Sequence, residues 1–214
     1  MNEGKGRYKW VAFSAMALGL FVTVMDFGGV GVAVPTIADE LDLELATASW
    51  VVLSAALTIS AVLLPAGGLS DMLGRKRSYL GGIVIYGLGL LGVGLAPGLI
   101  EIVLARVVAA IGSAMIMANG MAIVMTVFPP RERGKAMGLI TTCVGLAAIT
   151  GPIVSGGMID AFGWRSFFFL MAGGSAIAAA WAARTLDEKR ISVRRGGRLS
   201  EYDWIGTALS AGAL

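Results

Sequence analysis

The chain has 214 residues, of which 57% are hydrophobic and only 14% are charged, so it is too apolar for an ordinary water-facing surface. It has one cysteine, Cys143, and no histidine, which excludes a disulfide framework and a histidine-based metal site or proton switch. The net charge of +3 could suggest nucleic-acid binding, but the basic residues lie where membrane topology signals are expected. We therefore expect an integral membrane protein.

Six apolar runs approach or exceed the length of about 20 residues that a membrane-spanning helix needs. In chain order they are Trp10–Val34, Thr47–Leu69, Tyr79–Ala96, Leu99–Val127, Ala136–Ile159 and Ser166–Ala183. The first is too long for a signal-peptide core of roughly 7–15 residues, so we expect it to be retained. A seventh run begins at Trp204 and has only 11 residues.

These runs predict an all-α integral membrane fold, a six-helix bundle with the start of a seventh helix. The expected segments are a cytoplasmic tail (1–9), a six-helix unit (10–184), a basic cytoplasmic loop (185–203) and a truncated helix (204–214). The stop inside the seventh run favours a piece of a longer protein.

The basic residues predict the orientation of the bundle. Fifteen of the 17 lysines and arginines fall on one side, in the N-terminal tail, the loops after the second and fourth runs, and the segment after the sixth. The opposite loops carry only Arg165, and the loop after the first run is acidic. The N-terminus is therefore expected in the cytoplasm. Tryptophans at the predicted helix ends, including Trp50 and Trp164, are typical of an aromatic belt at headgroup level.

Two turns that lie 89 residues apart resemble each other, Gly67–Lys76 and Gly156–Arg165. Both contain a glycine pair, an aspartate, a further glycine and a basic residue. Each joins the second and third helices of a three-helix unit, one inside and one outside. Inverted three-helix repeats are typical of transporters, although glycine and aspartate are also common at membrane turns and the similarity could be chance.

Two charges are expected inside the membrane, Asp26 in the first run and Arg106 in the fourth. A carboxylate at membrane depth costs about 2.5–3.5 kcal/mol on insertion scales, so it is a functional hypothesis by default. At about 1.5 Å per residue, both lie roughly 10–12 Å from the outer ends of their predicted helices. They could pair directly or through a substrate, and the alternative is a purely structural ion pair. Burial favours a protonated carboxyl and a neighbouring base favours a carboxylate, the balance a proton carrier needs.

The loop after the second run reads Gly67-x-Leu69-Ser70-Asp71-x-x-Gly74-Arg75-Lys76. Here the chain resembles the major facilitator superfamily, whose cytoplasmic loop has the signature G-x-L-x-D-x-x-G-R-[KR]. The resemblance implies that Gly67, Asp71, Gly74, Arg75 and Lys76 latch two halves of a transporter together on the cytoplasmic side. The alternative is a solvated turn whose charges only set the topology.

Asp26 followed by Ala33 and Pro35 resembles the helix-one signature of the fourteen-helix drug:proton antiporters in that superfamily. The segment Arg106–Gly112 resembles the helix-four motif R-x-x-Q-G-x-G, but Ala109 and Ala110 stand where glutamine and glycine are expected. The resemblance implies a coupling role for Asp26 and Arg106.

The fifth run contains Gly145, Gly151-Pro152 and Gly156-Gly157, with Ser155 at a usual glycine. It resembles the antiporter motif of drug exporters, which implies a conformational role and export rather than uptake. The alternative is an ordinary kinked membrane helix, because proline removes one helical hydrogen bond.

The resemblance, which extends from Met25 to Gly206, implies the N-terminal half of a secondary transporter, most like the fourteen-helix branch, that exports small organic molecules or drugs. Uptake or exchange of another solute, or a non-transporting fragment that needs a partner, are the alternatives. No enzymatic activity and no cofactor are expected, and the proton gradient would supply the energy. The expected partners are a small-molecule substrate, the lipid bilayer, and a C-terminal half or a second copy, with no nucleic acid. The expected location is the inner (plasma) membrane, crossed several times.

Overall fold

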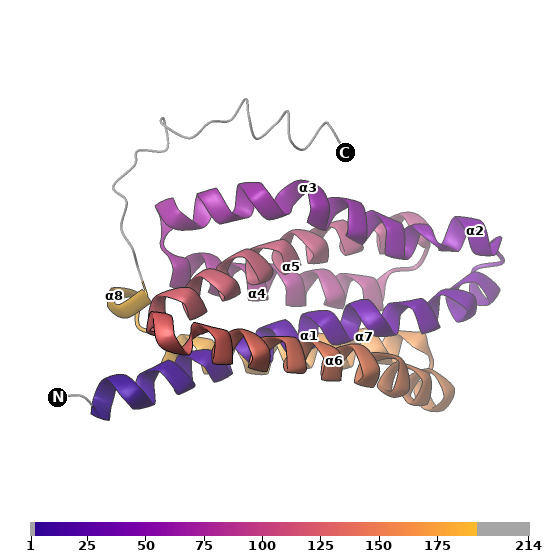
Figure 1. Ribbon diagram of the computed structural model, residues 1–214. Coiled ribbons are helices and arrows are strands. Elements are labelled where there is room, and N and C mark those ends of the chain that lie inside the picture. Colours follow the sequence, from indigo (N-terminus) through magenta and orange to yellow (C-terminus); the bar gives the residue numbers. More distant parts are fainter. Residues whose placement is uncertain (1–2, 192–214) are drawn as a thin grey trace.

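The computed structural model describes residues 3–191, and every regular element in that range is helical (Figure 1). In chain order the elements are α1 (Glu3–Glu40), α2 (Leu45–Ala48), α3 (Trp50–Leu73), α4 (Arg75–Leu95), α5 (Leu99–Val127), the 3-10 helix η1 (Pro130–Glu132), α6 (Arg133–Phe162), α7 (Trp164–Thr185) and α8 (Glu188–Ile191). The predicted seventh helix lies outside the described residues.

Six of these helices, α1 and α3 to α7, are long and apolar enough to cross a membrane, as the sequence predicts. The largest difference is in α1, which continues beyond the predicted end at Val34 to Glu40. Pro35 lies inside the helix, and Ile37 and Ala38 beyond it are buried. Proline is tolerated within membrane helices when neighbouring groups satisfy the backbone, so its presence after an apolar run does not fix the helix end.

The helices run alternately up and down, so that successive turns lie at opposite ends of the bundle (Figure 1). The start of α1, the α3–α4 turn, the α5–α6 connection and α8 share one end, on the left of the view. The predicted basic segments among the described residues therefore gather at this end, whereas the acidic end of α1 lies at the other.

The packing interlocks two three-helix units, α1–α3–α4 and α5–α6–α7. The first helix of each unit packs against the second and third helices of the other: α1 against α6 and α7, and α5 against α3 and α4. The two first helices touch each other, and so do the two third helices, α4 and α7. Each contact between helices therefore has an equivalent when the two units are exchanged. This symmetry supports the inverted repeat inferred from the two similar turns.

The repeated turns also share their backbone geometry. Gly74 has φ +97° and Gly163 has φ +79°, a region that strains other residues. Each glycine ends one helix and begins the next, and each N–H donates to the carbonyl four residues earlier, on Ser70 at 3.0 Å and on Ile159 at 2.9 Å. The glycines are 89 residues apart, as the repeat requires.

Small residues let the helices approach closely, which matters because apolar burial drives helix association little in lipid. On α4, a Cβ added at Gly89 would lie 2.7 Å from both the Cα and the Cβ of Ala109 on α5. Large apolar side chains such as Leu64 and Ile177 point outward instead, with 74% and 66% of their surface exposed. This pattern is that of a bundle surrounded by lipid.

One predicted belt residue is placed differently. Trp164 is buried, with 1% of its surface exposed, and its indole N–H donates to Glu40 Oε2 at 2.7 Å. Trp164 begins α7, at a helix end as the sequence predicts, but its side chain packs inside the protein because its polar tip has a partner at the end of α1. Trp10, Trp50 and Trp181 are partly exposed.

Candidate functional site

An ion pair between Asp26 and Arg106 lies inside the bundle. Asp26 comes from α1 and Arg106 from α5, and Nη1 of the arginine donates to Oδ2 at 2.8 Å and to Oδ1 at 3.1 Å. Only 3% of Asp26 and 2% of Arg106 is exposed. The two charges that the sequence places at similar depth are therefore in direct contact.

Arg106 also contacts two further helices. Its Nε donates to the carbonyl of Val51 on α3 at 3.3 Å, and its guanidinium carbon lies 5.9 Å from the ring centroid of Phe168 on α7. A buried guanidinium is tolerated when its charge is paired and its donors are used. The position of the arginine side chain is thus determined by contacts with α1, α3 and α7, and a movement of any of these helices would change the geometry of the ion pair.

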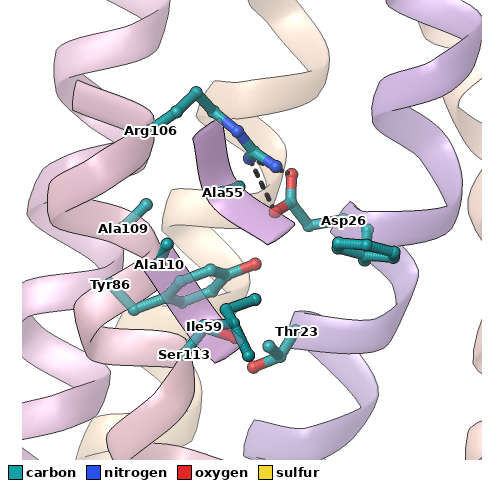
Figure 2. Close-up of a pocket in the computed structure, with 10 residues that line it drawn as sticks. Thr23, Asp26, Ala55, Ile59, Tyr86, Arg106, Ala109, Ala110 and Ser113 are labelled. Atoms are coloured by element: carbon teal, nitrogen blue, oxygen red, sulfur yellow. Dashed lines mark hydrogen bonds and ion pairs between the residues drawn. The ribbon is translucent and has the colours of Figure 1, made fainter. Parts of the chain in front are cut away.

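A small cavity of about 10 Å³ adjoins the ion pair, and Figure 2 shows the residues around it. Its polar lining consists of the two charged side chains and three hydroxyl groups, from Thr23, Tyr86 and Ser113. Ala109 and Ala110, which stand where the motif has glutamine and glycine, form part of its apolar wall. The side-chain amide of the motif is therefore absent from the surroundings of the arginine.

Sequence reasoning missed the three hydroxyl residues of this cavity. Thr23 precedes Asp26 by three residues and Ser113 follows Arg106 by seven, spacings that place each on the same helix face as its charged neighbour. That periodicity could have identified both. Nothing in the sequence marks Tyr86, which reaches the site from α4 only through the interlocked packing.

A larger cavity of about 270 Å³ lies between α1, α3 and α5, next to the small one. Its lining is mainly apolar with three hydroxyls: Thr23, Val24, Phe27, Ala56, Ile59, Ser60, Ser113 and Met117. Pockets for small organic ligands are typically about 300–1,000 Å³ and mostly apolar with a few placed polar groups. The larger cavity thus has a mainly apolar lining and a volume just below the usual range of such pockets.

The predicted helix-five motif divides into two faces. A Cβ at Gly151 would collide with the carbonyl oxygen of Met25 and lie 3.1 Å from the nitrogen of Gly29. Ser155, at a usual glycine of the motif, is buried and donates to the carbonyl of Gly29 at 2.8 Å. These two residues therefore pack α6 directly against the segment of α1 that carries Asp26.

The rest of that motif points elsewhere. A Cβ at Gly145 or Gly156 would meet no other described residue within 4 Å. Pro152 is largely exposed, although its Cδ lies 3.5 Å from a Cβ built at Gly28 on α1. The structure thus brings only part of the predicted motif to α1, and Gly145 and Gly156 lie on an open face of α6.

The predicted loop residues tie helices together at the basic end. Arg75 donates to the carbonyl of Ala122 at 3.1 Å and contacts Thr126, both on α5. Lys76 donates to the carbonyls of Ala183 at 3.0 Å and Leu186 at 2.5 Å, at the end of α7. The lysine thereby satisfies helix-terminal carbonyls and complements the negative end of that helix.

The glycines of the loop have different surroundings. Gly74 lies against the carboxylate of Glu188 in α8, whereas a Cβ at Gly67 would meet no other described residue within 4 Å. The backbone of Asp71 belongs to α3, and its side chain lies outside what the structure describes. Arg75 and Lys76 therefore brace this six-helix unit internally.

Comparison with known proteins places the chain in context. Residues 16–211 match the family model described as Major Facilitator Superfamily. The riboflavin transporter RibZ of Clostridioides difficile is 31% identical over 77% of this chain and 36% of its own length. The methylenomycin A resistance protein of Streptomyces coelicolor is 35% identical over 81% of this chain and 37% of its own. The chain therefore spans a little over a third of the length of these relatives.

A solved structure shares the fold. A bacterial homolog of the human lysosomal transporter Spinster, in an inward-facing and unoccupied conformation, aligns with a TM-score of 0.76 at 20% identity. The alignment covers 94% of this chain and 47% of that one. The described bundle thus corresponds to about half of that structure.

Proposed function

The chain belongs to the Major Facilitator Superfamily, and from that membership we propose that it forms the N-terminal half of a proton-coupled exporter of small organic molecules. The family consists of multi-pass membrane transporters and not of enzymes. The methylenomycin A resistance protein is a relative whose name refers to drug resistance, which supports export of organic compounds.

The observation that carries the proposal is the buried Asp26–Arg106 pair at the edge of a cavity of small-molecule size. Protonation of Asp26 would leave Arg106 as an unpaired buried charge. Removing one partner of a buried pair typically costs about 3–5 kcal/mol. That is close to the roughly 5.5 kcal/mol that moves a two-state equilibrium from 1:99 to 99:1. A proton on Asp26 could therefore drive a conformational change.

Substrate and proton would then alternate at the same site. With Asp26 ionised, the pair is closed and the cavity offers apolar and hydroxyl groups to a substrate. With Asp26 protonated, Arg106 would lose its partner and the bundle would rock against an opposing half. Major facilitator transporters bind their substrates near the bilayer midplane, and such rocking opens the site to each side of the membrane in turn. The opposing half would be a C-terminal continuation or a second copy.

The orientation follows from the charges. The basic end of the bundle, with Arg75, Arg133 and Arg184, would face the cytoplasm of a cell whose inner membrane holds the protein. The loop contacts of Arg75 and Lys76 would brace that end, and Asp71 with Gly67 would contribute to a latch between the halves.

Replacement of Asp26 by asparagine tests the proposal. In a transport-competent protein that contains this chain, Asp26→Asn should abolish pH-driven uptake of dyes or drugs into everted vesicles, which corresponds to export from the cell, and leave expression intact. Asp39→Asn, an exposed carboxyl at the end of α1, is the matched control and should transport normally. Normal efflux by Asp26→Asn would exclude the proposed coupling role.

Uptake or exchange of another solute is the second candidate, favoured by the relative named for riboflavin transport. Flux in both directions across vesicles of known orientation separates the two candidates. A proton-coupled exporter accumulates substrate only in everted vesicles whose lumen is acidic, because protons leave the lumen as substrate enters. A non-transporting half would show no flux in either orientation.

A further inference from the structure

We propose that Ser113 and a single water molecule in the small cavity form the proton route between Asp26 and the larger cavity. The proposal rests on the proposed function in one respect, that Asp26 binds and releases a proton. It adds a water site and a positioning residue to the coupling pair.

The hydroxyl of Ser113 is the starting observation. The residue is 3% exposed, and its buried Oγ has no hydrogen-bond partner among the described residues. A buried polar group without a partner costs about 1–3 kcal/mol, so such groups are usually satisfied by ordered water. Ser113 is one of the residues that line the small cavity, and the water is proposed there.

The small cavity suits one water molecule in volume and chemistry. Its volume of about 10 Å³ is close to the lower limit for holding one water. A buried water needs about two to four polar partners. The carboxylate of Asp26 and the hydroxyl residues Tyr86, Thr23 and Ser113 line the space. In Figure 2 these three residues lie below Asp26, and Arg106 lies above it.

Ser113 also borders the larger cavity, which gives the route its second end. Asp26 and Tyr86 line only the small cavity, whereas Ser60 lines only the larger one. Thr23 borders both, but its hydroxyl already donates to the carbonyl of Gly19 at 2.8 Å. Ser113 is therefore the bordering hydroxyl whose proton is not committed to a protein acceptor in the described range.

The remaining shared lining, Phe27 and Ile59, is apolar and carries no proton. The charged and titratable groups that face Asp26 are Arg106 from α5 and Tyr86 from α4. Among the described residues, α3 contributes Ala55 and Ile59 to this cavity, and α6 packs on this part of α1 through Gly151.

Proton transfer along this route conserves protons at every oxygen. A hydronium ion in the larger cavity gives one proton to Oγ of Ser113 and becomes water, while the hydroxyl gives its own proton to the cavity water. That water passes one of its protons to the carboxylate of Asp26. Serine and water end with the protons they began with, and Asp26 gains one as its contact with Arg106 breaks.

The test follows the carboxyl proton of Asp26 in the purified 214-residue chain. Infrared difference spectroscopy with labelled aspartate reports its protonation as the pH is lowered, and Asp26→Asn identifies the band. Rapid mixing into heavy water then gives the rate at which the carboxyl proton exchanges. Ser113→Val should slow this exchange at least tenfold. Ser113→Thr should not, because threonine has about the same size as valine but keeps the hydroxyl. Ser78→Val, at a buried serine of α4 that lines neither cavity, is the matched control and should exchange like the unsubstituted chain.

The outcomes separate this inference from the proposed function. Equal rates in Ser113→Val and the unsubstituted chain would overturn the route, and equal slowing by valine and threonine would assign the effect to packing. If Ser113→Val does not fold, Ser113→Ala replaces it with the same expectation. A chain in which Asp26 never takes up a proton at any pH would refute the proposed coupling, and the route with it.

Discussion

At the scale of single residues, Arg106 on α5 contacts three other helices, α1, α3 and α7. Its guanidinium holds the carboxylate of Asp26, a carbonyl of α3 and the ring face of Phe168. Desolvating both charges is expensive, and the pair persists because each charge is matched and the donors are used. Replacing Asp26 or Arg106 alone by a neutral residue should therefore lower the free energy of unfolding more than replacing both.

Arg106→Gln should destabilise the purified chain by about 3–5 kcal/mol, because it leaves a buried carboxylate without its partner. Denaturant unfolding in detergent, followed by circular dichroism, measures the change. The double variant Asp26→Asn with Arg106→Gln should recover most of the loss. Arg165→Gln, in the more exposed pair with Glu40, should cost less than about 1 kcal/mol. A double variant no more stable than Arg106→Gln would contradict this account.

The sequence alone could locate the charged pair but not its surroundings. Asp26 and Arg106 stand out because a charge within an apolar run is costly. Tyr86 does not, because hydroxyl residues are common in membrane helices and only the packing of α4 with α5 and α7 brings it to the pair. The burial of Trp164 could not be predicted for the same reason, since its partner Glu40 is remote in sequence.

At the scale of helices, apolar length predicted the number and order of the spans. The first apolar run was placed at Trp10–Val34, yet α1 continues to Glu40 and its far segment packs within the bundle. The similar residues of the two turns predicted the inverted repeat. The structure agrees, because Gly74 and Gly163 both have a positive φ. The interlocking of the two units could not be predicted, because it depends on contacts between helices remote in sequence.

Gly151→Leu should destabilise the chain strongly, because its side chain would meet the backbone of α1 at Met25 and Gly29. Overpacking typically costs about 1–3 kcal/mol, and a backbone obstacle leaves little room to relax. Gly145→Leu on the same helix is the control, and it should be neutral or slightly stabilising because its Cβ meets no other described residue within 4 Å. Thermal unfolding of the two variants measures the difference, and equal melting temperatures would argue against the close α1–α6 contact.

At the scale of the whole molecule, α3 and α6 are the least buried of the six spans. They are equivalent helices of the two units, and Gly145, Gly156 and Gly157 of α6 present an open surface. Small residues permit close helix approach in membranes. This surface is where we expect an opposing half to pack, so these glycines should matter for transport without mattering for the bundle itself.

Gly156→Trp should leave the folding of the 214-residue chain unchanged and lower transport at least tenfold in a transport-competent protein that contains it. Gly173→Trp is the matched control on α7, where a Cβ also meets no other described residue within 4 Å. Circular dichroism reports folding and dye efflux reports transport. Equal effects of the two tryptophans on efflux would place the opposing half elsewhere.

The ion pair also has a consequence for how the protein is made. Asp26 leaves the ribosome 80 residues before Arg106, an interval of roughly 4–16 s at about 5–20 residues per second. During that time α1 carries a carboxyl group into the bilayer without its partner, and its interlocked neighbours α6 and α7 are made later still. α1 is thus synthesised before the helices that it packs against, and it reaches its final surroundings only after α5, α6 and α7 are made.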